Sequence, residues 1–140
     1  MPRKARERSA TGCYHIMGRG INHAAIYNDD ADNMNFLHIL DFCADEDFTI
    51  FAYCLMGNHF HLLAKADADV LQHVMKAVGI RYVAYFNRRY QRDGPLFRGR
   101  YNSQPVTTKG YFLRVLRYIH RNPVAAGIVQ EMQDYPWSSY

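Results

Sequence analysis

The spacing of apolar residues predicts alternating strands and helices along the chain. Residues 48–56 (FTIFAYCLM) form a nearly continuous apolar run, typical of a strand that is covered on both faces. Residues 59–65 (HFHLLAK) resume after the Gly57-Asn58 break, which predicts a hairpin. The other predicted elements are a strand over 13–19, a sheet extension at 25–27, helices over 32–45 and 69–90, an edge strand over 100–106, and a helix over 109–121 that Thr108 caps and Asn122-Pro123 ends or resets.

The order of these elements predicts the fold class. A strand, a helix, a hairpin, a helix, a strand and a final helix imply an α+β sandwich, with a mixed or antiparallel sheet and the helices on one face. The 140 residues suit one domain, which we place at 11–140. Residues 1–10 are predicted to form a flexible basic arm.

Charge and aromatic content favour an anionic partner. The net charge is +4, with basic residues concentrated at 3–8, 81–100 and 109–121, and acidic residues at 29–47. The chain also has 11 tyrosines. Aromatic rings interleaved with arginine suit unpaired bases, which stack on the rings while their phosphates pair with guanidinium groups.

The cysteines and the apolar runs exclude other classes. The three cysteines are odd in number and widely spaced, without a CxxC pair, which argues against a disulfide framework and a thiolate zinc site. No apolar run reaches the ~20 residues of a membrane span. We therefore expect reduced cysteines, a cytoplasmic location and no membrane partner.

Two histidines at the start of a predicted strand are candidate metal ligands. Side chains alternate along a strand, so His59 and His61 point to the same face and Phe60 points to the other. Two imidazoles so placed can converge on one cation. Two histidines that are satisfied by hydrogen bonds would give the same short pattern, so the motif alone leaves both interpretations open.

The last predicted helix is amphipathic and carries a candidate nucleophile. Four apolar side chains form one stripe: Phe112, Val115, Leu116 and Ile119. Three arginines gather on the opposite side: Arg114, Arg117 and Arg121. Tyr118 and Asn122 are neighbours on a flank, at positions i and i+4. A tyrosine there can have a packed ring and an exposed hydroxyl, although a boundary tyrosine without chemistry has the same pattern.

The two features together suggest phosphoryl chemistry. Two neutral imidazoles and an amide oxygen leave the charge of a cation undiminished, so a phosphate would complete the site. A phenol nearby could then attack phosphorus. Five other tyrosines compete for this role, with Tyr111 the nearest rival by helical face: Tyr82, Tyr85, Tyr90, Tyr101 and Tyr111.

An ordered set of motifs resembles a known family. His59-Phe60-His61 is similar to the HUH motif of single-tyrosine transposases, and residues 118–124 (YIHRNPV) resemble the tyrosine helix of the REP-associated tyrosine transposases. Segments 12–16, 94–98 and 135–140 add to the resemblance, which thus covers nearly the whole chain.

The resemblance implies a ferredoxin-like domain that cleaves and rejoins single-stranded DNA containing hairpins. In the family, a tyrosine, here Tyr118, forms a 5′-phosphotyrosine link and frees a 3′-hydroxyl. The family's metal ligands fall on His59, His61 and Asn122, and the implied metal is Mg²⁺ or Mn²⁺. Dimers are common in the family, but monomers occur in the REP-associated branch, so a homodimer and a monomer both remain open.

Two other functions compete with a transposase. A non-catalytic single-stranded nucleic-acid-binding protein would need the arginines and tyrosines but not both histidines. A metal-dependent nuclease would use water as its nucleophile and leave no covalent adduct. In every case the predicted DNA contacts are basic: Arg3, Lys4, Arg6, Arg98, Arg100, Arg114 and Arg117.

Overall fold

The computed structural model describes residues 4–140. The elements, in chain order, are β1 (Cys13–Arg19), the 3-10 helix η1 (Ile21–His23), α1 (Asp30–Cys43), β2 (Thr49–Leu55), β3 (His59–Lys65), α2 (Ala68–Tyr90), β4 (Asn102–Pro105), α3 (Lys109–Ala125) and the 3-10 helix η2 (Met132–Asp134). Most bounds fall within a few residues of those predicted from the apolar pattern. Thr108 caps α3 as expected, because its side chain accepts a hydrogen bond from the backbone N–H of Tyr111 at 3.1 Å.

The four strands form one antiparallel sheet in the order β2-β3-β1-β4. Together with the sequence β1-α1-β2-β3-α2-β4, this order is the ferredoxin-like arrangement, which confirms the predicted α+β class. The central strands are β1 and β3, which pair along their whole length, Cys13 opposite Lys65 and Arg19 opposite His59. The short strand β4 lies at an edge beside β1.

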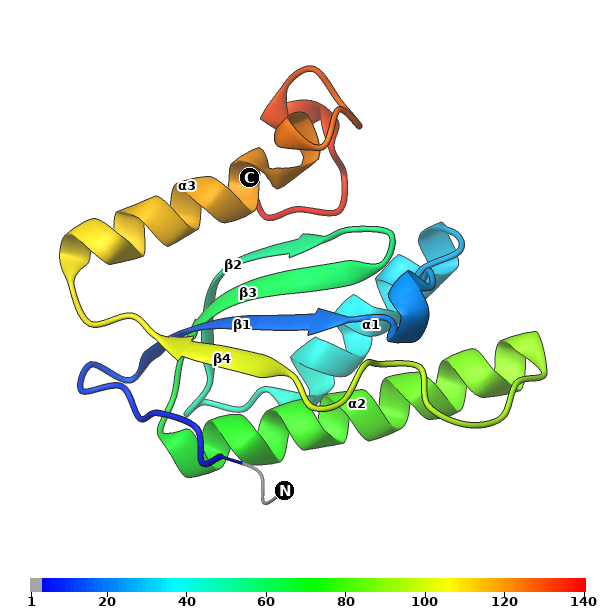
Figure 1. Cartoon of the computed structure of the whole chain (residues 1–140), viewed down its shortest axis with the longest axis horizontal. Helices are drawn as coiled ribbons and strands as arrows, with labels where there is room; N and C mark the ends of the chain where they lie inside the picture. Colours follow the sequence, from blue (N-terminus) through cyan, green and yellow to red (C-terminus); the bar gives the residue numbers. More distant parts are fainter. Residues whose placement is uncertain (1–3) are drawn as a thin grey trace.

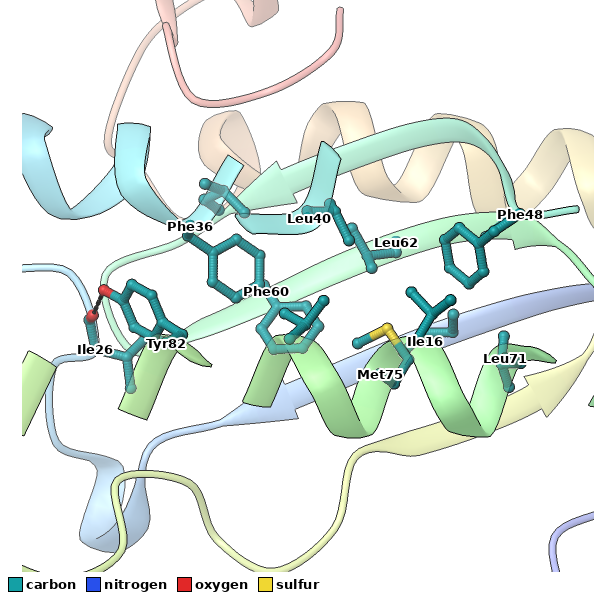
Figure 2. Close-up of a cluster of buried hydrophobic side chains, with 14 of the residues drawn as sticks. Ile16, Ile26, Phe36, Leu40, Phe48, Phe60, Leu62, Leu71, Met75 and Tyr82 are labelled. Carbon is teal, nitrogen blue, oxygen red and sulfur yellow. Dashed lines mark hydrogen bonds between the residues drawn. The ribbon is translucent and has the colours of Figure 1, made fainter. Parts of the chain in front are cut away.

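The main core lies between the sheet and the pair α1 and α2 (Figures 1 and 2). Ile16 and Leu62 point into it from the sheet, and Phe36 and Tyr82 meet them from the helices. The Tyr82 hydroxyl donates a hydrogen bond to the Ile26 carbonyl, so this buried phenol is satisfied.

The expectation that all helices share one face is wrong for α3. This helix covers the opposite face of the sheet and packs over β2 and β3 (Figure 1). Its stripe residues Val115 and Ile119 are buried against Ala52 and Leu63. The physical reason is the apolar run of β2, which has apolar side chains on both faces and so requires a layer on each side.

Two local expectations also differ from the structure. Residues 25–27 do not extend the sheet; the backbone N–H groups of Ile26 and Tyr27 donate instead to the Gly57 carbonyl, at 2.9 and 3.3 Å. Helix α3 does not end at Asn122 but continues through Pro123 to Ala125. Pro123 lies in the last turn and is buried, and its carbonyl accepts a hydrogen bond from the backbone N–H of Ile128 at 3.0 Å.

The described part of the N-terminal arm contacts the domain. The Arg6 guanidinium lies over the Tyr101 ring, 3.8 Å from its centroid, and donates to the Tyr101 carbonyl at 2.9 Å. Arg8 pairs with Asp69 at 3.3 Å. Within residues 4–140, no helix has the length and apolar character needed to span a bilayer.

Candidate functional site

The two histidines of β3 face the layer that α3 forms. Phe60 and Leu62 point into the main core on the other side, so strand alternation places His59 and His61 together on the opposite face, which is the face that α3 covers. The two imidazole rings are perpendicular, with centroids 5.1 Å apart. His61 is almost fully buried and His59 is half-buried.

Helix α3 brings Tyr118 to these histidines. Its apolar stripe fixes the helix on the sheet through Ile119, which is fully buried, and this leaves the neighbouring Tyr118 at the boundary with solvent, 54% exposed. The Tyr118 ring meets the His61 ring edge-to-face at 5.4 Å between centroids. The phenol therefore combines a packed ring with access for a large substrate.

A pocket of about 860 Å³ lies between the sheet and the exposed flank of α3. Tyr118, His61 and Asn122 line it together, which is the combination that the motifs predicted, whereas His59 is not part of its lining. Three arginines of α3 also contribute to the lining: Arg114, Arg117 and Arg121. Among the described residues the lining contains no aspartate or glutamate, so the pocket suits an anion.

The sequence interpretation gave no role to His15, which lies at the centre of this site. His15 is on β1, directly opposite Leu63 in the register, and its ring stacks on His61 with centroids 5.2 Å apart. Its Nε2 lies 3.0 Å from Nδ1 of His61, and its ring is 6.1 Å from that of Tyr118. Alternation along β1 predicts which of its residues share a face with His15. It does not predict that His15 lies beside His61, because that depends on how β1 and β3 are aligned.

Burial keeps the site's imidazoles neutral. Desolvation, followed by the neighbouring His15 and His59, lowers the pKa of His61 to about 3. Burial also lowers the pKa of His15, and burial with the Arg19 charge lowers the pKa of His59. Neutral imidazoles offer lone pairs to a cation at physiological pH without competition from protons.

The side chains that could ligate a cation at this site offer nitrogen and amide oxygen atoms. His59 Nδ1 lies 2.7 Å from the Asn58 side-chain oxygen, and His61 Nδ1 faces His15, so each histidine keeps Nε2 for a ligand. No group of three or more His, Cys, Asp or Glu side chains within residues 4–140 is arranged to hold a metal by itself. The available ligands are thus two imidazoles and the amide of Asn122, without a carboxylate.

The other predicted DNA contacts lie elsewhere. Arg98, Arg100 and Arg6 line a second pocket, on the α2 side of the sheet. Lys4 lines a shallow pocket beside β4 together with Gln104. Gln104, which the sequence interpretation did not single out, also lines the Tyr118 pocket. Arg3 lies outside the described residues.

Comparisons with known proteins decide the family. The family model described as IS200-like transposase matches residues 9–122. The chain belongs to the IS200-like transposase family. It is therefore a transposase, a member of an enzyme family that acts on DNA, as its motifs predicted.

Two solved structures have folds similar to that of this transposase. A structure of a REP-associated tyrosine transposase bound to a REP hairpin has a TM-score of 0.76 and 16% identity, and the match covers 100% of this chain and 83% of that one. The crystal structure of a candidate transposase from Deinococcus radiodurans R1 has a TM-score of 0.51 and 20% identity, and the match covers 85% of this chain and 94% of that one. At these identities the likeness shows the fold alone. A search of curated proteins gave no significant match.

Proposed function

We propose that this transposase cleaves and rejoins single-stranded DNA with Tyr118 as its nucleophile. The observation that carries the proposal is the contact between the Tyr118 and His61 rings, 5.4 Å between centroids, in a pocket with three arginines and no carboxylate among its described lining residues. Tyr118 is exposed enough to meet a DNA strand. The rival Tyr111 also lines the pocket, but its hydroxyl lies 3.4 Å from Gln104, and no ring contact joins it to the histidines in the described part of the chain.

The reaction exchanges one phosphoester for another. The Tyr118 oxygen loses its proton and bonds to phosphorus, while the bond from phosphorus to the 3′-oxygen breaks. The 3′-oxygen leaves with a proton as a free hydroxyl, and the 5′-phosphate remains on the tyrosine. Attack by a 3′-hydroxyl reverses these steps and releases Tyr118, so joining needs no external energy source.

His59, His61 and Asn122 would hold Mg²⁺ or Mn²⁺. Such a cation acts as a Lewis acid on the scissile phosphate, when it is bound. The chain's own contribution is a set of neutral ligands, which leaves the positive charge for the phosphate. Arg114 and Arg117, on the exposed side of the pocket, are expected to bind neighbouring phosphates and align the strand for attack.

Hairpin-containing single-stranded DNA is the proposed substrate. One structural relative was solved with a REP hairpin bound, and its fold covers the whole of this chain. The pocket is open to solvent along the arginine side of α3, as a strand that enters from a duplex stem requires. The proposed substrate class is therefore a hairpin with an unpaired flank that reaches Tyr118.

A covalent-adduct assay tests the proposal. The protein is incubated with end-labelled hairpin DNA from the region that flanks its own gene, with Mn²⁺ or Mg²⁺, and resolved on a denaturing gel. We expect a protein–DNA band with the wild type and its loss in Tyr118→Phe and His59→Ala. Tyr111→Phe is the matched control and should keep the band.

The other outcomes separate the competing functions. Cleavage without a covalent band would support the nuclease that uses water. Binding without cleavage or a band, over several flanking hairpins, would support a non-catalytic nucleic-acid-binding protein. A band that survives in Tyr118→Phe would move the nucleophile to another tyrosine.

A further inference from the structure

A second pocket, on the face of the sheet away from Tyr118, has the features of a base-binding site. We propose that it binds one unpaired nucleobase of the DNA substrate, with the adjoining phosphates on its basic rim. This inference rests on the proposed function in that it takes single-stranded DNA as the ligand. It adds a recognition site that is separate from the catalytic pocket.

The pocket lies between α2 and the segment that leads from α2 to β4, which runs back beside the helix (Figure 1). Its volume is about 410 Å³, within the ~300–1,000 Å³ that ligand pockets span. Four aromatic side chains contribute to its walls: Phe36, Phe60, Phe97 and Tyr101. Phe36 and Phe60 are buried and form the floor of the pocket, and the Arg6 guanidinium lies over the Tyr101 ring. The partly exposed Phe97 ring is therefore the surface on which a base can stack.

Gly18 allows these aromatic walls to form. A Cβ at this position would lie 2.4 Å from Cε1 of Phe60, so only glycine lets the Phe60 ring lie across β1. Phe97 then meets Phe60 edge-to-face, with centroids 6.0 Å apart. On the opposite side, Gly79 leaves the α2 wall open, because a Cβ there would meet no atom within 4 Å.

The rim of the pocket is basic. Five cationic side chains line it: Arg6, Arg19, Lys76, Arg98 and Arg100. No aspartate or glutamate does so within residues 4–140, whereas two neighbouring surface pockets contain aspartates. Lys76, Arg98 and Arg100 form no ion pair with a carboxylate among the described residues, so their charges face the solvent. The apolar aromatic interior would accommodate a base, and the cationic rim would contact the phosphates on either side of it.

The edge strand β4 connects this pocket with the catalytic one. Tyr101 lines the base pocket, and Gln104, three residues later, lines the Tyr118 pocket on the other face. Three residues of extended chain span about 10 Å. A DNA strand that crosses the β4 edge would therefore place a base in this pocket a few nucleotides from the scissile phosphate, which points to a role in recognition and not in chemistry.

Filling the pocket at Gly79 tests the proposal. Gly79→Leu places a side chain into open space and should leave the fold intact, and Gly79→Ala is the matched control, which fills almost none of the volume. Binding is measured by fluorescence anisotropy, without metal and in a Tyr118→Phe background. The probes are a labelled DNA hairpin with oligothymidine flanks and the same hairpin with blunt ends. Thermal melting of each variant verifies folding.

We expect Gly79→Leu to weaken binding of the flanked hairpin by roughly 5- to 150-fold, the range for loss of one stacked base, and to leave the blunt hairpin unaffected. Gly79→Ala should bind both probes as the parent does. In the parent, replacing flank thymidines one at a time by abasic sites should identify one position with the same loss, and Gly79→Leu should be insensitive to that position.

Unchanged binding of the flanked hairpin to a folded Gly79→Leu, or an abasic scan without a sensitive position, would overturn the base pocket. The proposed function would survive either result, since the covalent band depends on Tyr118. Conversely, if the parent bound neither probe, DNA recognition itself would fail, and the base pocket with it.

Discussion

His15 Nε2 lies 3.0 Å from Nδ1 of His61, the histidine that meets the Tyr118 ring. If His61 is to offer the Nε2 lone pair to a cation, its proton must be on Nδ1, and the Nδ1–H then donates to His15. In the proposed metal site, His15 would thus select the tautomer of His61 that leaves Nε2 for the cation, and it would fix the orientation of the His61 ring. Partners of this kind typically affect metal affinity by about 10- to 100-fold.

We predict that His15→Phe, which keeps a ring but removes the acceptor, lowers Mn²⁺ affinity by about tenfold or more. His15→Gln should recover part of the loss, because its amide oxygen can accept from His61. Manganese binding is followed by electron paramagnetic resonance with hairpin DNA present, in a Tyr118→Phe background. His73→Phe, on the exposed side of α2, is the control. Equal affinities for His15→Phe and its parent would remove His15 from this role.

Asn122 supplies a second prediction about the metal. Since the proposed ligand set has no carboxylate, Asn122→Asp adds the negative charge that this set lacks and should raise Mn²⁺ affinity in the absence of DNA. Asn122→Leu removes the oxygen at similar size and should lower it. Both are measured by isothermal titration calorimetry. If the two variants have the same effect, Asn122 is not a ligand.

The arginines of α3 should contribute to DNA binding through charge. Arg117 lines the Tyr118 pocket, so Arg117→Gln should weaken binding of all single-stranded sequences alike and reduce the slope of log affinity against log salt by about 0.7. Anisotropy titrations over a range of salt concentrations measure the slope. Arg81→Gln is the control, since the Arg81 guanidinium lies over the Phe42 ring, 4.7 Å from its centroid, away from both pockets. An unchanged slope for Arg117→Gln would contradict a phosphate contact.

The fold was largely predictable because period-2 and period-3.6 patterns report directly on strands and helices. The face that α3 covers was not, since an amphipathic stripe requires an apolar surface but does not say which one. Strand β2, which has apolar side chains on both faces, was the sequence feature that indicated a layer on each side of the sheet. Helix α3 also passes through Pro123, where the local rule for proline predicted an end.

The candidate site was predictable where one element carries the pattern. Local periodicity predicts that His59 and His61 share one face of a strand and that Tyr118 and Asn122 are neighbours on a helix, whereas their proposed roles come from the family resemblance. His15 was missed because only the register between β1 and β3 brings it beside His61, which is 46 positions away in the chain. Arg98 and Arg100 were predicted to bind DNA, but only the folded chain places them with Phe97 and Tyr101 around one pocket.

Asp32 ties α1 to α2 and provides a prediction for stability. Its buried carboxylate accepts hydrogen bonds from the Tyr90 hydroxyl at 2.6 Å, the Asn28 backbone at 2.9 Å, the Tyr85 hydroxyl at 2.9 Å and Arg89 at 2.7 Å. Burial alone would raise the pKa of Asp32, but these four donors outweigh it and hold the pKa below 3.8. The ionised form is thus the one that the folded state stabilises.

Asp32→Asn should therefore lower the free energy of unfolding by about 3 kcal/mol at neutral pH, since the amide loses the charge and cannot accept all four bonds. Because the folded-state pKa lies below the ordinary 3.8, the wild type keeps this stabilisation above that pH and loses it as the pH falls through the folded-state value. The difference between wild type and variant should shrink in acid. Urea unfolding at several pH values measures it, with the exposed Asp41→Asn of the same helix as control. A difference that stays constant down to strongly acidic pH would mean that the carboxylate charge is not what stabilises this contact.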